Sequence, residues 1–106
     1  MSAIRISVAA ETGALGLSGA LGIYEAETVR QAILEHLAAR SELVLDLRAV
    51  EACDTAGAQI LCAARRTAGQ AGKPIRFLGV APAITECWAR LGLPQNLLMA
   101  PAANSI

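Results

Sequence analysis

The sequence predicts one α/β domain: a mixed β-sheet of four to five strands, covered by three to four helices. Strand-like runs alternate with segments of helical periodicity, which favours a largely parallel sheet with right-handed crossovers. The first two strand-like runs follow each other directly, which adds an antiparallel hairpin. The chain of 106 residues has the length of a single domain. We expect its core to span about residues 4–98, with a loose C-terminal tail.

The first half of the chain predicts a hairpin and a helix. Residues 4–8 alternate between apolar and polar side chains, and residues 15–18 repeat the alternation after turn residues at 11–13. A period of two indicates strands with one face on the core. Residues 25–39 place apolar side chains at spacings of three and four, the pattern of a helix with one buried stripe.

The second half predicts further strands and helices. Residues 43–47 are almost continuously apolar, which indicates a central strand covered on both faces. A helix is expected over 55–68, a strand over 75–80 and a helix from Pro82, a favoured residue in a first helical turn. The apolar face of this last helix is expected to consist of Ile84, Trp88 and Leu91, with Trp88 as a core anchor. Residues 97–99 suggest a short edge strand.

Composition excludes several classes of function. Hydrophobic residues make up 55% and aromatic residues 3%, so the core must be aliphatic. The net charge is zero and no basic cluster occurs, unlike in a nucleic-acid-binding protein. No apolar run approaches the ~18 residues of a membrane span. The N-terminal residues lack the apolar stretch of a signal peptide, so a cytoplasmic location is expected. The short, neutral chain with an aliphatic core gives no sign of an obligate oligomer, so a monomer is expected.

Cysteine and histidine give no sign of a metal site, cofactor or enzyme. Cys53, Cys62 and Cys87 form no closely spaced pair, and their odd number disfavours a disulfide framework. Cys62 and Cys87 are expected in the core. A nucleophilic Cys53 would need a neighbourhood that lowers its pKa, and the sequence shows no such group nearby. The single His36 is expected at the surface or half-buried.

The chemically most distinctive stretch joins the apolar strand to the following helix. Asp54 is a good helix N-cap, and Thr55 would lie in the first turn with its hydroxyl outward. A helix N-terminus favours an anion, either bound or attached to Thr55 as phosphate. A plain helix cap is the alternative explanation. Gly57 costs the helix about 1 kcal/mol against alanine. Either a second backbone passes close to it, or a partner needs a flat surface there.

Several motifs, in their order, resemble those of a STAS domain, the fold of anti-sigma factor antagonists. The resemblance covers about residues 4–98 and includes the opening hairpin. It rests on a Gly-x-Leu at residues 19–21, the Leu-Val-Leu-Asp-Leu strand at 43–47, Asp-Thr-Ala-Gly at 54–57 and Gly-Leu-Pro at 92–94.

The resemblance implies a phospho-regulated interaction module. Thr55 would accept a phosphate from an ATP-dependent serine/threonine kinase that is also an anti-sigma factor. The capping and partner-binding surface would be made by the neighbouring residues Asp54, Ala56, Gly57, Ala58 and Gln59. Phosphate, with a charge of about −1.5 to −2, would then clash with and repel a close-fitting acidic partner.

The chain departs from the antagonist pattern at two places. Antagonists usually carry an aspartate where this chain has Gly22, and Leu-Gly where it has Ala58 and Gln59. The Asp-Thr-x-Gly motif also resembles the STAS subunit of a lipid-transport ABC system, which docks on its ATPase without phosphate chemistry. A chemotaxis-associated STAS module is a third alternative.

Overall fold

The computed structural model describes residues 4–94. In chain order the elements are β1 (Arg5–Val8), β2 (Leu15–Leu21), a 3₁₀ turn η1 (Ile23–Glu25), α1 (Ala26–Ala39), β3 (Leu43–Cys53), α2 (Thr55–Gln70), β4 (Ile75–Val80) and α3 (Pro82–Arg90). This order confirms the predicted α/β class, with the hairpin first and β–α units after it. The expected strand at residues 97–99 and the tail lie outside the described residues.

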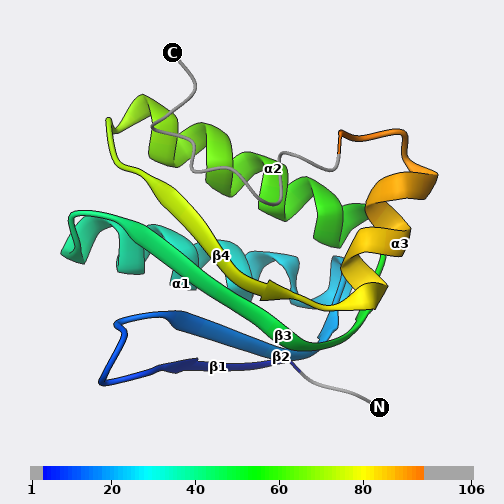
Figure 1. Cartoon of the computed structure of the whole chain (residues 1–106), viewed down its shortest axis with the longest axis horizontal. Helices are drawn as coiled ribbons and strands as arrows, with labels where there is room; N and C mark the ends of the chain where they lie inside the picture. The colour runs from blue at the N-terminus through cyan, green and yellow to red at the C-terminus, as the bar shows by residue number, and fades with distance from the viewer. Residues whose placement is uncertain (1–3, 95–106) are drawn as a thin grey trace.

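The strands form one mixed sheet in the order β1-β2-β3-β4 (Figure 1). β1 pairs antiparallel with β2, as the hairpin prediction requires. β3 lies parallel to both β2 and β4, so the apolar run at residues 43–47 is central, as predicted. In the parallel part, register shifts occur in both pairings, including one between Gly19 and Ala20, close to the end of β2.

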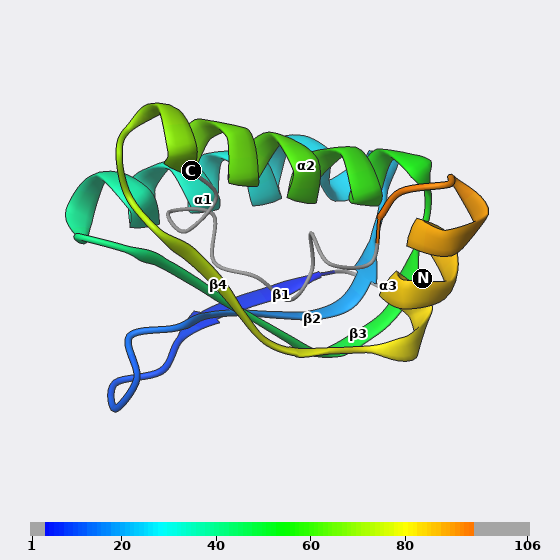
Figure 2. The ribbon, with the colours of Figure 1, turned by 45° about the horizontal axis from the view of Figure 1, so that its top comes forward.

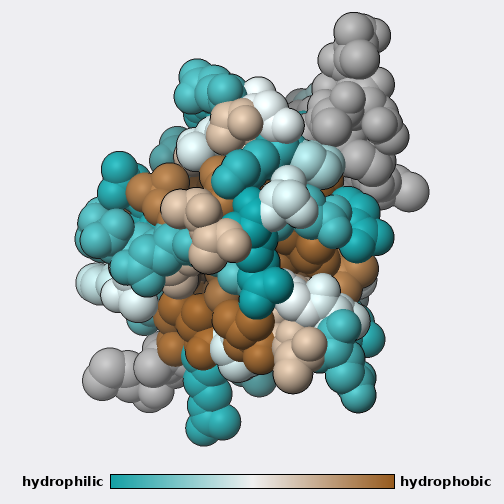
Figure 3. All heavy atoms as spheres, turned by 90° about the vertical axis from the view of Figure 1, so that its left-hand side faces the viewer, coloured by the Kyte–Doolittle hydropathy of each residue, from teal (hydrophilic) through white to brown (hydrophobic). Residues whose placement is uncertain are grey.

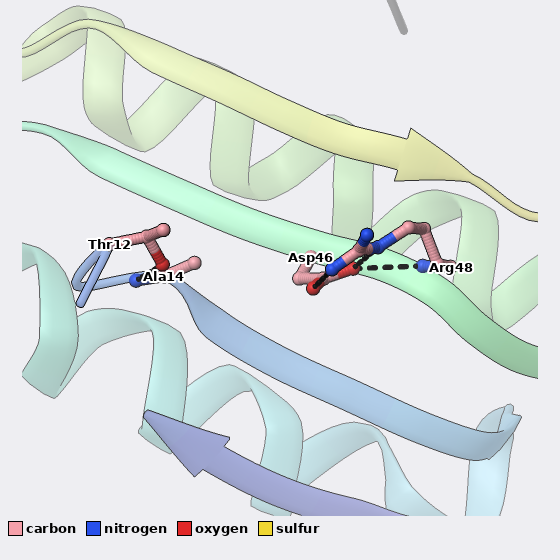
Figure 4. A network of polar contacts seen from close by, with 4 residues as sticks. All are labelled: Thr12, Ala14, Asp46 and Arg48. Atoms are coloured by element: carbon pink, nitrogen blue, oxygen red, sulfur yellow. Dashed lines mark hydrogen bonds and ion pairs between the residues drawn. The ribbon is translucent and has the colours of Figure 1, made fainter. Parts of the chain in front are cut away.

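Helices α1 and α2 lie on the same face of the sheet (Figure 2). In the units β2-α1-β3 and β3-α2-β4, the chain moves to the next strand in the same direction across the sheet. Because such crossovers are right-handed, both helices are placed on the same side of the sheet. Val44 is buried like Leu43 and Leu45 on either side of it, which agrees with the prediction that this run is covered on both faces. On the other face, Asp46 and Arg48 form an ion pair of 2.7 Å, in front of the sheet in Figure 4.

The core lies between the sheet and the helices and is largely aliphatic, as the composition predicts. Its largest fully buried side chains are Trp88, Leu17, Leu21, Leu43, Leu45, Leu47, Leu61, Ile75, Ile84 and Val29. The predicted role of Trp88 as a core anchor is confirmed, and its Nε1 donates to the Pro94 carbonyl at 2.8 Å. Two predicted core residues are exposed instead. Val8 lies on the edge strand β1, and Leu91 follows the last residue of α3.

The described residues at the end where α1 finishes carry their apolar surface in separate patches. Figure 3 views this end, and hydrophilic side chains there separate the hydrophobic patches. Within residues 4–94, none of the helices is long and apolar enough to cross a membrane.

His36 is buried, contrary to the surface or half-buried position predicted from the sequence. Its side chain is 7% exposed, and its Nε2 has no hydrogen-bond partner among the described residues. Burial lowers the pKa of the imidazole from its ordinary value of 6.5, and the Arg40 charge lowers it further, whereas a backbone hydrogen bond with Gly13 opposes both. The folded protein therefore favours neutral His36.

We expect His36 to make folding sensitive to mild acid. Because the folded state lowers the pKa of His36, the unfolded chain binds the proton more readily. This contribution to stability is fully present above about pH 6.5 and decreases as pH falls from there towards the folded-state pKa. Urea unfolding followed between these pH values measures it. His36→Met should remove this part of the pH dependence, and an unchanged dependence in the variant would contradict the expectation.

Candidate functional site

The candidate site lies at the carboxyl edge of the sheet, on the right in Figure 1. β2 and β3 are parallel and end together, since Leu21 is paired with Cys53. η1 starts two residues after the end of β2, and α2 starts two residues after the end of β3. This topology brings the segment around Gly22 against the segment around Asp54, although about 30 residues separate them in sequence.

Asp54 connects three elements of this edge. Its Oδ1 accepts from the Gly57 N–H at 2.9 Å, which confirms the predicted N-cap. Its Oδ2 accepts from the Ile23 N–H at 3.3 Å, and its own N–H donates to the Leu21 carbonyl at 3.2 Å. The sequence predicts the cap from its local pattern, but the bonds to β2 and η1 depend on the tertiary structure.

Thr55 is the first residue of α2 and is exposed. The position at the helix start is the predicted one. Asp54 holds the start of the helix through Gly57, so the backbone next to Thr55 is fixed by the cap. Thr55 is therefore an exposed polar residue on a backbone whose position the cap fixes.

Gly57 and Ala58 are buried, so they do not provide the flat partner surface predicted from the sequence. A Cβ on Gly57 would collide with the Leu21 carbonyl oxygen and would lie 3.0 Å from Cys53 Sγ. Glycine is therefore required at residue 57 because the backbone of β2 passes close to it, and not because a partner needs a flat surface there. Ala56 is half-buried and Gln59 is exposed, so part of the predicted surface remains accessible.

Gly22, which replaces the aspartate of antagonists, lies directly beside Asp54. A Cβ on Gly22 would come within 2.7 Å of Asp54 Oδ2. Any side chain at this position would force the Asp54 carboxylate to move from the place where it accepts from Ile23. The absence of an acid at residue 22 therefore agrees with the dual role of Asp54 in this chain.

An open apolar groove next to Asp54 was not predicted from the sequence. It has a volume of about 470 Å³ and is lined by Ala20, Leu21, Gly22, Ile23, Tyr24, Glu25, Ala52, Cys53 and Asp54. Two of these lining residues, Ile23 and Tyr24, are 65% and 94% exposed. The sequence signal for this groove is the apolar pair Ile23–Tyr24, which lies directly before the first helix and outside its buried stripe.

The cysteines near the site are poorly suited to nucleophilic chemistry. Burial raises the pKa of Cys53 to about 12, and the neighbouring Cys87 and Asp54 contribute in the same direction. Cys87 is buried in the core as predicted, whereas Cys62 is half-buried. Among residues 4–94, no three His, Cys, Asp or Glu residues are grouped so that they could hold a metal ion.

We expect Asp54→Ala to destabilise the domain by about 1 kcal/mol, because the variant loses the N-cap of α2. The Ile23 N–H would lose its acceptor as well. Asp54→Asn keeps a side-chain oxygen for Gly57 and should cost less. Urea unfolding of both variants measures the difference. Equal losses would show that the carboxylate charge, and not the cap geometry, stabilises this end of α2.

A search of curated proteins finds no significant match. A crystal structure of an anti-sigma factor antagonist from Mycobacterium paratuberculosis is similar in fold, with a TM-score of 0.68 at 24% identity, over 87% of this chain and 79% of that one. The family model described as "Mlab, STAS domain" matches residues 4–100. The chain therefore belongs to the STAS domain family.

Proposed function

We propose that this chain is a non-enzymatic protein-interaction module that binds its partner through the exposed residues Ile23, Tyr24, Thr55 and Gln59, here called the docking face. The observation that carries the proposal is the position of Thr55. It is exposed at the start of α2, on a backbone held by Asp54, and it follows Asp54, which lines the groove together with the exposed residues Ile23 and Tyr24. Exposed large apolar side chains beside a polar group are typical of protein-binding surfaces.

The partner we propose is an anti-sigma factor with serine/threonine kinase activity. The support is the similar fold of an anti-sigma factor antagonist, together with a threonine at the site where the family resemblance implies a phospho-acceptor. In this proposal the unmodified chain binds the partner, and phosphorylation of Thr55 releases it.

Physical chemistry supports release by phosphate at this position. The phosphate group is much larger than a hydroxyl and carries about −1.5 to −2 charge. The Asp54 carboxylate accepts hydrogen bonds from the Gly57 and Ile23 N–H groups and cannot move aside without losing them. A phosphate on Thr55 would therefore project outward into a close-fitting contact, and its removal from water would be costly. The free domain would tolerate the same charge, because it lies at a helix N-terminus.

The test is phosphorylation in vitro followed by a binding measurement. The chain is incubated with ATP and its cognate kinase, and the modified residue is located by mass spectrometry. We expect modification at Thr55, its loss in Thr55→Ala, and no change in Thr28→Ala, which alters an exposed threonine on α1. The phosphorylated chain should bind at least about tenfold more weakly. Modification elsewhere, or binding that is unaffected, would overturn the switch.

A second candidate is a constitutive subunit that docks on the ATPase of a lipid-transport ABC system. Two observations favour it. The matched family is described by the name Mlab rather than as an antagonist, and Gly22 replaces the aspartate of the antagonist pattern. The chain would then co-purify with an ABC ATPase without phosphate on Thr55, and removal of the chain would abolish ATPase activity. Absence of such a complex would eliminate this candidate.

A further inference from the structure

We propose that the groove beside Asp54 binds a partner segment in which a large apolar side chain is flanked by lysine or arginine. This inference rests on the proposed docking function and specifies the chemistry of the partner at the docking face. It differs from the acidic partner expected from the sequence.

The chain exposes one of its few aromatic residues at the groove. The sequence contains one Trp, one Tyr and one Phe. Trp88 is fully buried and Phe77 packs against the core, whereas Tyr24 is almost completely exposed. Tyrosine is among the residues that contribute most to binding energy at protein interfaces. Together with Ile23 and Ala52, it offers a surface onto which an apolar side chain can pack.

The charge of the groove selects the flanking residues of the partner. Glu25 and Asp54 line the groove, and its nine lining residues include no Lys, Arg or His. Each Asp54 oxygen accepts one backbone hydrogen bond, and a carboxylate oxygen can accept a second. A cationic partner group would complete this hydrogen bonding and offset both negative charges. An acidic segment would be repelled by the same two carboxylates.

The groove is also held in shape before any partner arrives. The Asp54 side chain bonds to the first residue of η1, and its backbone bonds to the end of β2. Gly22 leaves room for this arrangement, because a side chain there would displace the carboxylate. A preformed groove avoids the ordering cost that weakens binding to flexible surfaces.

The test uses two short peptides, Gly-Lys-Phe-Lys-Gly and Gly-Glu-Phe-Glu-Gly, titrated into the full ¹⁵N-labelled chain. We expect the lysine peptide to shift the backbone amide resonances of residues 20–25 and 52–54, and the glutamate peptide to leave them unchanged. Tyr24→Ala should weaken binding of the lysine peptide about tenfold. Glu25→Lys should weaken it about two- to fivefold, the range of an exposed ion pair. Glu35→Lys, at an exposed position on α1, is the matched control and should have no effect.

Thr55 provides a second readout with the same lysine peptide. Thr55→Gln and Thr55→Glu add similar bulk, but only the latter adds negative charge. The short lysine peptide fills only the groove, so it should bind Thr55→Glu at least as tightly as Thr55→Gln, whereas an acidic peptide would show the reverse order. Release of the whole partner by phosphate, as proposed above, then depends on the bulk of the phosphate in the contact and not on charge repulsion.

Equal binding of both peptides, preference for the glutamate peptide, or no shift at residues 20–25 and 52–54 would overturn the inference. Failure of the proposed function gives a different result. In that case the lysine peptide still binds the groove, but no kinase or ATPase is captured by the chain and Thr55 is never modified.

Discussion

Replacing Gly57 by valine is expected to destabilise the domain by about 3 kcal/mol or more, the upper range for overpacking in a tightly packed interior. A Cβ at this position would collide with the backbone carbonyl of Leu21 and press against Cys53. The Leu21 carbonyl belongs to the backbone at the end of a paired strand, so it cannot swing away as a flexible side chain can. Either α2 must move from the end of β2, or the Asp54 cap must break. Urea unfolding, with the groove amides followed by NMR, measures both consequences.

Gly69 provides the matched control because it lies in the same helix with nothing within 4 Å of the position of its Cβ. Gly69→Ala should therefore stabilise the domain by about 1 kcal/mol, the difference in helix propensity. If Gly57→Val were tolerated as well as Gly69→Ala, the close approach of β2 to α2 would be absent in solution. The close approach of the Leu21 carbonyl would then not be the reason for glycine at residue 57.

Replacing Leu45 by alanine is expected to cost about 2–5 kcal/mol, the range for truncating a buried leucine. Leu45 is fully buried in β3, between its partners Leu15 on β2 and Phe77 on β4. The central strand cannot shift to fill the cavity without breaking the pairing on both sides. The change in the urea midpoint at constant slope measures the loss.

Leu91→Ala is the control for this truncation, because Leu91 is 41% exposed just after the end of α3. It should cost clearly less than 1 kcal/mol, as surface substitutions usually do. Similar losses at Leu45 and Leu91 would contradict the assignment of β3 as the centre of the core.

Local patterns in the sequence determined the elements and the cap. The alternation of polar and apolar residues identified β1 and β2, the continuous apolar run identified β3, and the pair Asp54 and Thr55 identified the start of α2. These features depend on residues a few positions apart, where periodicity and capping chemistry act directly. The aliphatic core with its single tryptophan followed from composition for the same reason.

Only the tertiary structure decided which residues of the motif are accessible and what lies beside them. Helices α1 and α2 share one face because the strand order steps in a single direction, and no local pattern specifies that order. The burial of Gly57 depends on β2 passing next to α2, and the burial of His36 on the hairpin packing against α1. The groove likewise exists because Asp54 binds η1 from a position 31 residues away. Contacts between distant segments arise from packing, and packing, not sequence proximity, places Tyr24 and Asp54 in the lining of one groove.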